Sequence, residues 1–240
     1  MDASLDLDLV EVGGFFLRRQ DEHFVALGGA LGQYQQKVRS AAYRYVERWT
    51  TAIDVGGHVG IFSRDFASRF ETVHAFEPMP YNRACLERNA APNTVIHPCG
   101  LGDRPGVAEM RYVWKNSGGS EVVDPDHIAG ASSAPVAAEG KRILAEIRTL
   151  DSFGIENVGL IKIDVQGMEE HVLKGARETL LRWQPVVILE EKVVKTRPQD
   201  TRAIEAAAAV IRSLGYERAE TVGQDSIYVV AKGAQPRTLD

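Results

Sequence analysis

Short apolar runs recur along the chain and predict the buried strands of a sheet. The segment between the first two runs carries apolar residues at helical spacing: Ile61, Phe62, Phe66 and Phe70. Strands that alternate with helices predict an α/β fold, in which a mainly parallel sheet has helices on both faces. The runs lie at residues 51–55, 72–76, 94–99, 159–165 and 185–189.

The C-terminal part continues this alternation and then ends differently. Helices are expected from Met168 to Trp183 and from Thr201 to Leu214, with Asp200 as the cap of the second. Gly215 is suited to a left-handed helix stop. The last two apolar segments, around 216–221 and 226–231, predict an antiparallel hairpin that closes the sheet.

Two segments interrupt the pattern. Residues 1–48 form an expected N-terminal cap in front of a domain spanning 49–240, and a helical pattern runs from Gln33 to Trp49. Residues 114–142 are rich in Gly, Ser, Ala and Pro, follow an extra strand at 107–113, and are expected to form an inserted, lid-like loop. In such folds these segments build the acceptor pocket, and here they carry no recognisable substrate code.

Composition narrows the classes of partner. The 240 residues, 44% of them hydrophobic, suffice for one buried core, and the net charge of −5 argues against nucleic-acid or anionic-membrane surfaces. Cys85 and Cys99 are the whole cysteine content and lack zinc or disulfide spacing, so two buried thiols in a reducing cytoplasm are expected. No run approaches the about 20 apolar residues of a membrane span, and no secretory leader is evident. We expect a cytoplasmic protein with a small-molecule partner.

Acidic residues follow the buried strands. Because the carboxyl ends of parallel strands meet at one edge of a sheet, where ligands bind at the reversal of strand order, these acids are candidate site residues. They are Asp54, Glu77, Asp103, Asp164 and Glu190.

The turn after the first of these acids distinguishes between nucleotide-binding classes. A dinucleotide fingerprint that starts at Gly56 would need glycines where His58 and Ile61 stand, and a P-loop would need Gly-Lys at 61 and 62. What remains is a turn in which Gly56, Gly57 and Gly60 permit close backbone approach, followed by Glu77 roughly 20 residues on, where an acid binds ribose hydroxyls. A ribose-containing cofactor without phosphates, S-adenosylmethionine, fits this turn.

Several neighbouring residues are further candidates for cofactor contact. Asp54 can hold the cofactor's amino group directly or through water, or can simply cap the turn. Asp103 can meet the adenine amino group, with a plain turn as the alternative, and Gly102 beside it is a further candidate for cofactor contact. His58 beside the turn and Pro78 beside Glu77 belong to the predicted cofactor site. Ser63 completes it, with a plain helix-start residue as the alternative.

Three ordered motifs resemble the FkbM family of methyltransferases. They are Ile-Asp-Val-Gly-Gly-His-Val-Gly-Ile-Phe-Ser at 53–63, Ala-Phe-Glu-Pro-Met-Pro-Tyr-Asn at 75–82, and Leu-Ile-Lys-Ile-Asp-Val-Gln-Gly-Met-Glu at 160–169, which is followed by Val-Leu-Lys-Gly-Ala. The resemblance runs from about Ala52 to Glu191. It implies a class I, Rossmann-like methyltransferase fold with seven strands, the last antiparallel, and O-methylation of natural products or sugars.

The resemblance also assigns roles to individual positions. It implies that Asp54, Gly56 and Gly60 form the cofactor turn and that Glu77 binds the ribose. Asp164, with Gly167 and Glu169, matches the fourth-strand motif. His58 departs from the small or amide residue that is common at its position.

Methyl transfer to a hydroxyl needs alignment and a route for the proton. Asp164, joined by Glu190, is the predicted catalytic group, and Asp164 also adjoins the cofactor; a histidine or a divalent metal remains open as an alternative route. No histidine has metal-ligand spacing, so no metal site is predicted. The competing hypotheses are a cofactor-binding scaffold or sensor without turnover and an NAD-dependent oxidoreductase. The sequence does not indicate an oligomeric state.

Overall fold

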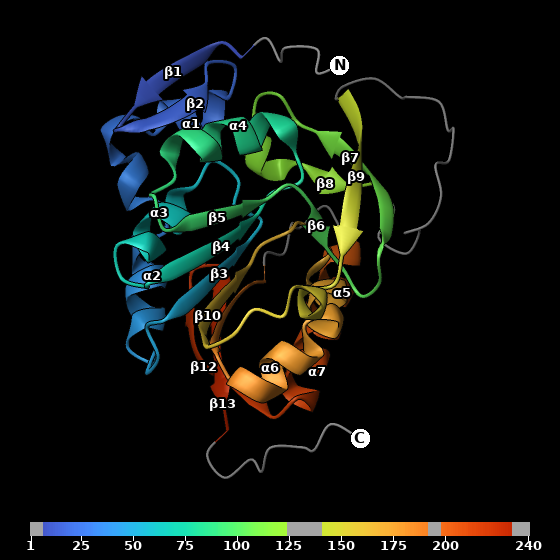
Figure 1. The fold of residues 1–240 in the computed structure, drawn as a ribbon. Coiled ribbons are helices and arrows are strands. Elements are labelled where there is room, and N and C mark those ends of the chain that lie inside the picture. The colour runs from blue at the N-terminus through green and yellow to red at the C-terminus, as the bar shows by residue number, and fades with distance from the viewer. Residues whose placement is uncertain (1–6, 124–140, 192–197, 232–240) are drawn as a thin grey trace.

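A seven-stranded sheet forms the centre of the protein (Figure 1). The computed structural model describes residues 7–123, 141–191 and 198–231. The strand order is β12-β13-β11-β10-β3-β4-β5, in which neighbours from β11 to β5 are parallel, while β13 is antiparallel to both β11 and β12. This confirms the seven strands, the antiparallel last strand and the closing hairpin. The bounds are β3 (Thr51–Val55), β4 (Thr72–Phe76), β5 (Thr94–His97), β10 (Val158–Ile163), β11 (Val186–Glu190), β12 (Tyr216–Val222) and β13 (Asp225–Val230).

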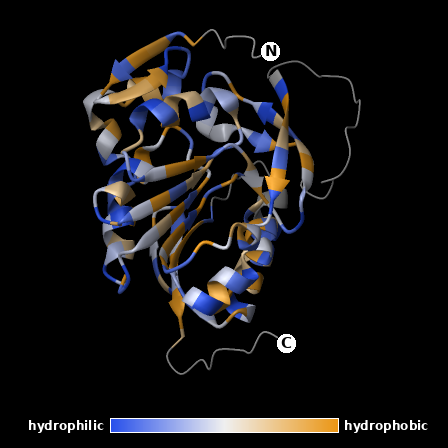
Figure 2. Ribbon diagram, in the orientation of Figure 1, coloured by the Kyte–Doolittle hydropathy of each residue, from blue (hydrophilic) through white to orange (hydrophobic). Residues whose placement is uncertain are grey.

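Helices cover both faces of this sheet, as Figure 1 shows. On one face α5 (Glu169–Gly175), α6 (Arg177–Trp183) and α7 (Pro198–Ser213) pack on β10 and β11. On the other face α2 (Gln36–Tyr43) and α3 (Ile61–Ala67) form a second core with β3, β4 and β10. Figure 2 shows hydrophobic colouring along the central strands and hydrophilic positions recurring on the outer helices.

The middle strands are buried at every position. All five residues of β3 and all six of β10 are buried, so each strand is a nearly continuous apolar run. The strand order reverses beside β3, because the chain proceeds from β3 to β4 and β5 on one side and returns to β10 on the other. This reversal is where an α/β sheet leaves a crevice at its carboxyl edge.

The N-terminal segment combines a hairpin with short helices. Strands β1 (Leu9–Val12) and β2 (Phe15–Arg18) pair, and α1 (Glu22–Ala26) and a 3₁₀ turn η1 (Gly28–Gln33) lead into α2. The expected helix from Gln33 to Trp49 is shorter, because Gln35 adopts a left-handed φ of 51° before α2 begins. The hairpin packs against α4 (Pro80–Asn89), which follows β4.

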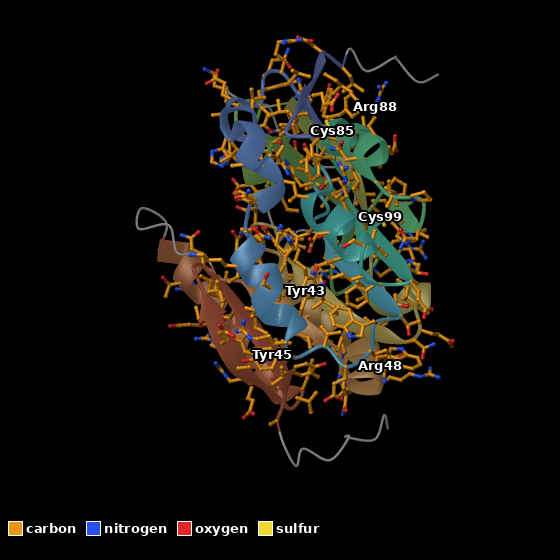
Figure 3. All side chains as sticks on the ribbon, turned by 90° about the vertical axis from the view of Figure 1, so that its left-hand side faces the viewer. Tyr43, Tyr45, Arg48, Cys85, Arg88 and Cys99 are labelled. Carbon is orange, nitrogen blue, oxygen red and sulfur yellow. The ribbon has the colours of Figure 1, made fainter. Side chains whose placement is uncertain are left out.

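Hydrogen bonds tie the chain between α2 and β3 to the start of β10 and the end of α6. Arg48 donates to the carbonyls of Val158 (3.2 Å) and Trp183 (2.9 Å), while Tyr43 donates to Asp65 in α3. Figure 3 shows Tyr43, Tyr45 and Arg48 along this stretch. Helix α2, which belongs to the expected N-terminal cap, therefore shares a core with the sheet.

A second, four-stranded sheet contains part of the expected insert. Its order is β6-β9-β7-β8, and its bounds are β6 (Gly100–Leu101), β7 (Gly106–Tyr112), β8 (Glu121–Val122) and β9 (Lys141–Arg148). The extra strand expected at 107–113 is β7. The lid-like loop expected at 114–142 is only partly a loop, since η2 (Ser117–Gly119) and β8 are regular and β8 pairs with β7. Residues 124–140 lie outside the described residues.

Two C-terminal helix predictions need correction. The helix expected from Met168 to Trp183 is divided at Ala176 into α5 and α6, because Asp151 accepts from the backbone amides of Glu178 and Thr179, each at 2.9 Å, and so caps α6. Helix α7 begins at Pro198, so Asp200 lies within it. Asp151 belongs to η3 (Leu150–Phe153).

Both cysteines are buried free thiols, as expected, and Figure 3 shows them on separate parts of the chain. Cys85 lies in α4, and Cys99 lies between β5 and β6. Burial raises the pKa of each thiol to about 11, which keeps both protonated at neutral pH.

Candidate active site

A cavity opens at the carboxyl edge of the central sheet, beside the reversal of strand order. Its lining includes the ends of β3, β4 and β11, the turn after β3 and the segment after β10. Most of the predicted site residues meet there: Asp54, Gly56, Gly57, His58, Glu77, Pro78, Asp164 and Glu190. Gly60, Ser63, Gly102 and Asp103 are not among the lining residues.

The turn after β3 is held tightly against its neighbouring strands. The amides of Gly56 and Gly57 both donate to the carbonyl of Phe76, at 3.0 and 2.9 Å. Gly56 has a left-handed φ of 81°, and a Cβ atom there would lie 2.0 Å from the carbonyl oxygen of Asp164. The turn can approach β10 this closely only with glycine at this position.

A Gly56→Ala variant is therefore expected to lose cofactor binding and to be destabilised. The added methyl group combines an unfavourable φ with a backbone clash, which together cost about 1–3 kcal/mol or more. Thermal denaturation and calorimetry with S-adenosylmethionine measure the two effects. Gly29→Ala is the matched control, because a Cβ atom added at Gly29 would meet no other atom within 4 Å. Wild-type binding by Gly56→Ala would contradict this view of the turn.

Glu77 is oriented by two backbone amides. Its Oε2 accepts from the amide of His58 at 2.8 Å, and its Oε1 accepts from the amide of Met79 at 2.9 Å. Burial raises the pKa of Glu77 to about 7, although the two amide donors oppose this rise. The carboxylate lines the cavity in a fixed orientation, as a ligand for paired hydroxyls requires.

Asp54 and Lys162 form a buried charged group below the turn. The ammonium of Lys162 lies 3.4 Å from Asp54 Oδ1 and 3.5 Å from Asp164 Oδ2, and it donates to the carbonyl of Gly56 at 2.9 Å. Burial acts to lower the pKa of Lys162, but Asp164 and Asp54 raise it above its ordinary value. Lys162 is therefore a fixed cation rather than a proton acceptor.

Ser63 acts on Asp54 rather than on the cavity. Its hydroxyl donates to Asp54 Oδ2 at 2.5 Å, and both side chains are fully buried. Burial raises the pKa of Asp54, against the effect of Lys162 and Ser63. Gly60 likewise lies behind the turn, where a Cβ atom would stand 2.8 Å from Leu86 Cδ1.

Asp164 and Glu190 are brought together by Gln166. The Gln166 amide nitrogen donates to Asp164 Oδ1 at 2.8 Å and to Glu190 Oε2 at 2.6 Å. Burial acts to raise the pKa of Asp164, but Lys162 and the hydrogen bonds from Glu190 and Gln166 lower it below its usual range. Asp164 is thus ionised at neutral pH.

The fourth-strand motif separates two roles. Glu169 turns back to accept from the amides of Val165 (3.1 Å) and Gly167 (3.0 Å), so it holds the loop that carries Gln166. Asp164 lines the cavity.

The structure places Gly102 and Asp103 beside α5 and not among the residues that line the cavity. Pairing of β6 with β9 directs the chain after Leu101 toward α5, where Asp103 Oδ2 lies 3.3 Å from His171 Nδ1. The carbonyl of Gly102 packs so closely on Gly175 that a Cβ atom there would stand 1.9 Å away. Gly100 and Leu101 line the cavity instead.

Several lining residues carry no recognisable sequence signal. Tyr34 and Phe24 come from the N-terminal segment, and Ser117 comes from η2. Burial raises the pKa of Tyr34, and Asp164 and Glu190 raise it further, so its phenol stays a hydrogen-bond donor. Gln166 belongs to the fourth-strand motif, but its role depends on the spacing of two strand ends that are far apart in sequence.

Neither a membrane span nor a metal cluster is found in the part of the chain that the structure describes. Among the described residues, no helix has the length and apolar character needed to cross a membrane. Within 7–123, 141–191 and 198–231, no cluster of three or more His, Cys, Asp or Glu side chains forms a metal-binding group. His97 pairs with His74 outside the cavity, at 3.0 Å between ring nitrogens.

The sheet order, the antiparallel β13 and an acid-lined cavity at the strand reversal define the class as an α/β methyltransferase. The family model for the methyltransferase FkbM domain matches residues 54–218. The chain belongs to the FkbM methyltransferase family.

Individual relatives are more distant. The chain is 30% identical over 154 residues to 31-O-demethyl-FK506 methyltransferase FkbM of Streptomyces tacrolimicus. This alignment covers 52% of this chain and 58% of that protein. It is 27% identical over 141 residues to Methyltransferase 1 of Beauveria bassiana, with 51% and 57% covered. The crystal structure of methyltransferase FkbM from Methylobacillus flagellatus aligns with a TM-score of 0.48 and 18% identity, covering 87% of this chain and 55% of that one. The chain thus spans little more than half the length of these relatives.

Proposed function

We propose that this protein uses S-adenosylmethionine to methylate a hydroxyl group on a small molecule. The observation that carries the proposal is that Glu77 and the turn at Gly56 line the same cavity as Asp164 and Glu190. A donor site and a candidate proton acceptor therefore share one space.

The residues present suit this cofactor. Glu77 would bind the ribose hydroxyls, and the backbone at Gly56 and Gly57 would pass close to the cofactor. Asp54 Oδ1 is buried, makes no hydrogen bond within the described residues and pairs with Lys162 at 3.4 Å, so it retains capacity for the cofactor's amino group. These carboxylates would attract a sulfonium cation and repel a pyrophosphate, which favours S-adenosylmethionine over NAD.

The remaining chemistry is alignment and removal of a proton. When bound, S-adenosylmethionine supplies an electrophilic methyl group. The protein must hold the acceptor oxygen in line at about 3 Å, and Asp164, ionised and held by Gln166, is placed to accept the hydroxyl proton. The name of the Streptomyces relative, which specifies an O-demethyl substrate, supports oxygen as the acceptor atom.

Calorimetry with S-adenosylmethionine and with NAD tests the cofactor, and preferential binding of NAD would overturn the proposal. An acceptor screen with a labelled methyl donor then tests turnover on sugars and natural-product alcohols. Binding without any turnover would favour the scaffold or sensor hypothesis. Turnover that survives EDTA is expected, since Asp164 and Gln166 supply the proton route without a metal.

Small-molecule specificity and a cytoplasmic location complete the proposal.

Cofactor affinity is expected to depend on pH through Glu77. Its pKa of about 7 exceeds the ordinary value of 4.5, so the folded free protein holds this proton and loses stability as pH rises from about 4.5 toward 7. Ribose binding needs the ionised form, so affinity should rise about tenfold between pH 6 and pH 8. Calorimetry across this range measures the effect, and Glu77→Gln should flatten it. A pH-independent affinity in the wild type would contradict the prediction.

A further inference from the structure

His58 occupies a constrained position in the cofactor turn. Its φ is 50°, in the left-handed region, and its backbone amide donates to Glu77 Oε2 at 2.8 Å. Whatever orients Glu77 therefore also orients the His58 backbone. The side chain points away from this bond, toward segments that belong to neither the turn nor the central sheet.

The imidazole ring of His58 contacts two distant segments. Its centroid lies 4.7 Å from that of Phe24 in α1, and its Nε2 lies 2.5 Å from the hydroxyl oxygen of Ser117 in η2. These segments lie 34 and 59 residues from His58 in the sequence, on its two sides. Both line the cavity, and together we call Glu22–Ala26 and Ser117–Gly119 the acceptor wall.

The hydrogen bond from Ser117 to Asp21 decides which atom is the donor between His58 and Ser117. The Ser117 hydroxyl donates to Asp21 Oδ2, and Asp21 Oδ1 accepts from the amide of Phe24 at 3.3 Å. A hydroxyl has one proton to donate, so His58 Nε2 must donate to Ser117. Burial lowers the pKa of His58 to about 3, which keeps the ring neutral at neutral pH.

Lys115, which lies just before the second segment of the acceptor wall, contacts the first segment. The amide of His23 donates to the carbonyl of Lys115 at 3.2 Å, and the Lys115 ammonium pairs with Glu22 at 3.1 Å. The Glu22 and Lys115 side chains are exposed, so this ion pair contributes little. The hydrogen bonds that join Glu77, His58, Ser117 and Asp21 are buried or part-buried, and they connect the acid proposed to bind ribose to the wall.

We propose that His58 is a positioning residue that couples occupancy of the methyl-donor site to ordering of the acceptor wall. This inference rests on the proposed function for the identity of the donor. A donor bound to Glu77 holds the His58 backbone in place, and the ring then holds Ser117 and α1 over the cavity. The acceptor consequently meets a formed wall only when the donor is present.

Hydrogen exchange with and without S-adenosylhomocysteine tests this coupling. In the wild type the ligand is expected to slow exchange of backbone amides in 22–26 and 117–119. His58→Asn should lose that protection while its affinity for S-adenosylhomocysteine stays within about threefold, because asparagine tolerates a left-handed φ and keeps the amide bond to Glu77. Once an acceptor is identified, the KM of His58→Asn for that acceptor should rise about tenfold, as expected for one lost hydrogen bond. Its kcat should change less.

Ser117→Ala gives an independent test, since it breaks the link and leaves the cofactor turn intact. It should remove the same protection, the double variant should add nothing further, and Ser117→Thr should restore protection. His74→Asn is the matched control, because His74 lies outside the cavity.

Full ligand-induced protection in both single variants would overturn the coupling. A loss of affinity that parallels the loss of protection would also overturn it and would make His58 a cofactor contact only. Failure of the wild type to bind S-adenosylhomocysteine would remove the proposed function along with the coupling. Binding with unchanged protection in the variants would remove only the coupling.

Discussion

Replacement of Asp164 by alanine is expected to reduce turnover by about 10²–10⁴-fold, the usual contribution of a positioned proton acceptor. Affinity for S-adenosylmethionine should stay within about threefold. Lys162 would still pair with Asp54 and donate to the carbonyl of Gly56, so the cofactor turn keeps its support. The backbone of Asp164, which packs on Gly56, is unchanged by the substitution.

Initial rates with an acceptor from the screen, combined with calorimetry, measure the two parts of this prediction. Asp103→Ala is the matched control, because that carboxylate contacts His171 and lies outside the cavity. It should retain wild-type rate and affinity. If Asp164→Ala turns over at the wild-type rate, Asp164 has no part in the mechanism. Lost affinity in Asp103→Ala would support the expected contact of that residue with adenine.

Replacement of Glu77 by alanine is expected to abolish measurable cofactor binding. Two charge-assisted hydrogen bonds to ribose, each about 1.5–3 kcal/mol, amount to a loss of at least about 100-fold in affinity. The change also leaves the buried amides of His58 and Met79 without their acceptor, at about 1–3 kcal/mol each. The variant should therefore be less stable as well.

Calorimetry at pH 8 measures the affinity, and a thermal melt shows whether the variant is folded. Glu77→Gln is the milder companion, since it keeps one acceptor oxygen and removes the charge. A folded Glu77→Ala variant with wild-type affinity would show that the cofactor is bound elsewhere. A weakened but folded Glu77→Gln variant would attribute the loss to the carboxylate itself.

The elements that could be predicted from sequence are those whose environment is uniform along the segment. Strands β3 and β10 are covered on both faces, so nearly every position is apolar and the run itself identifies the strand. The turn after β3 was equally predictable, because Gly56 is required by a close approach that no other residue permits. Glu77 was predictable too, because it stands directly after β4, where an acid was expected.

Sequence patterns did not indicate the local path of the chain where a distant contact sets it. The turn at Asp103 has ordinary turn chemistry, yet pairing of β6 with β9 directs it to α5. The break between α5 and α6 depends on Asp151, which lies 27 residues before Glu178, the nearer of the two residues whose amides it accepts. Neither pairing leaves a local signal, because each partner is ordinary in its own segment.

The sequence by itself determined the class of sheet, the glycine turn after β3 and the acids at the strand ends, because strand burial and glycine backbone chemistry are local properties. Only the tertiary structure decided which acids share the cavity and that Gln166 joins Asp164 to Glu190. It alone brought Ser117 to His58 from 59 residues away. Such contacts depend on where the strands and loops end in space, and hydrophobic periodicity carries no information about that.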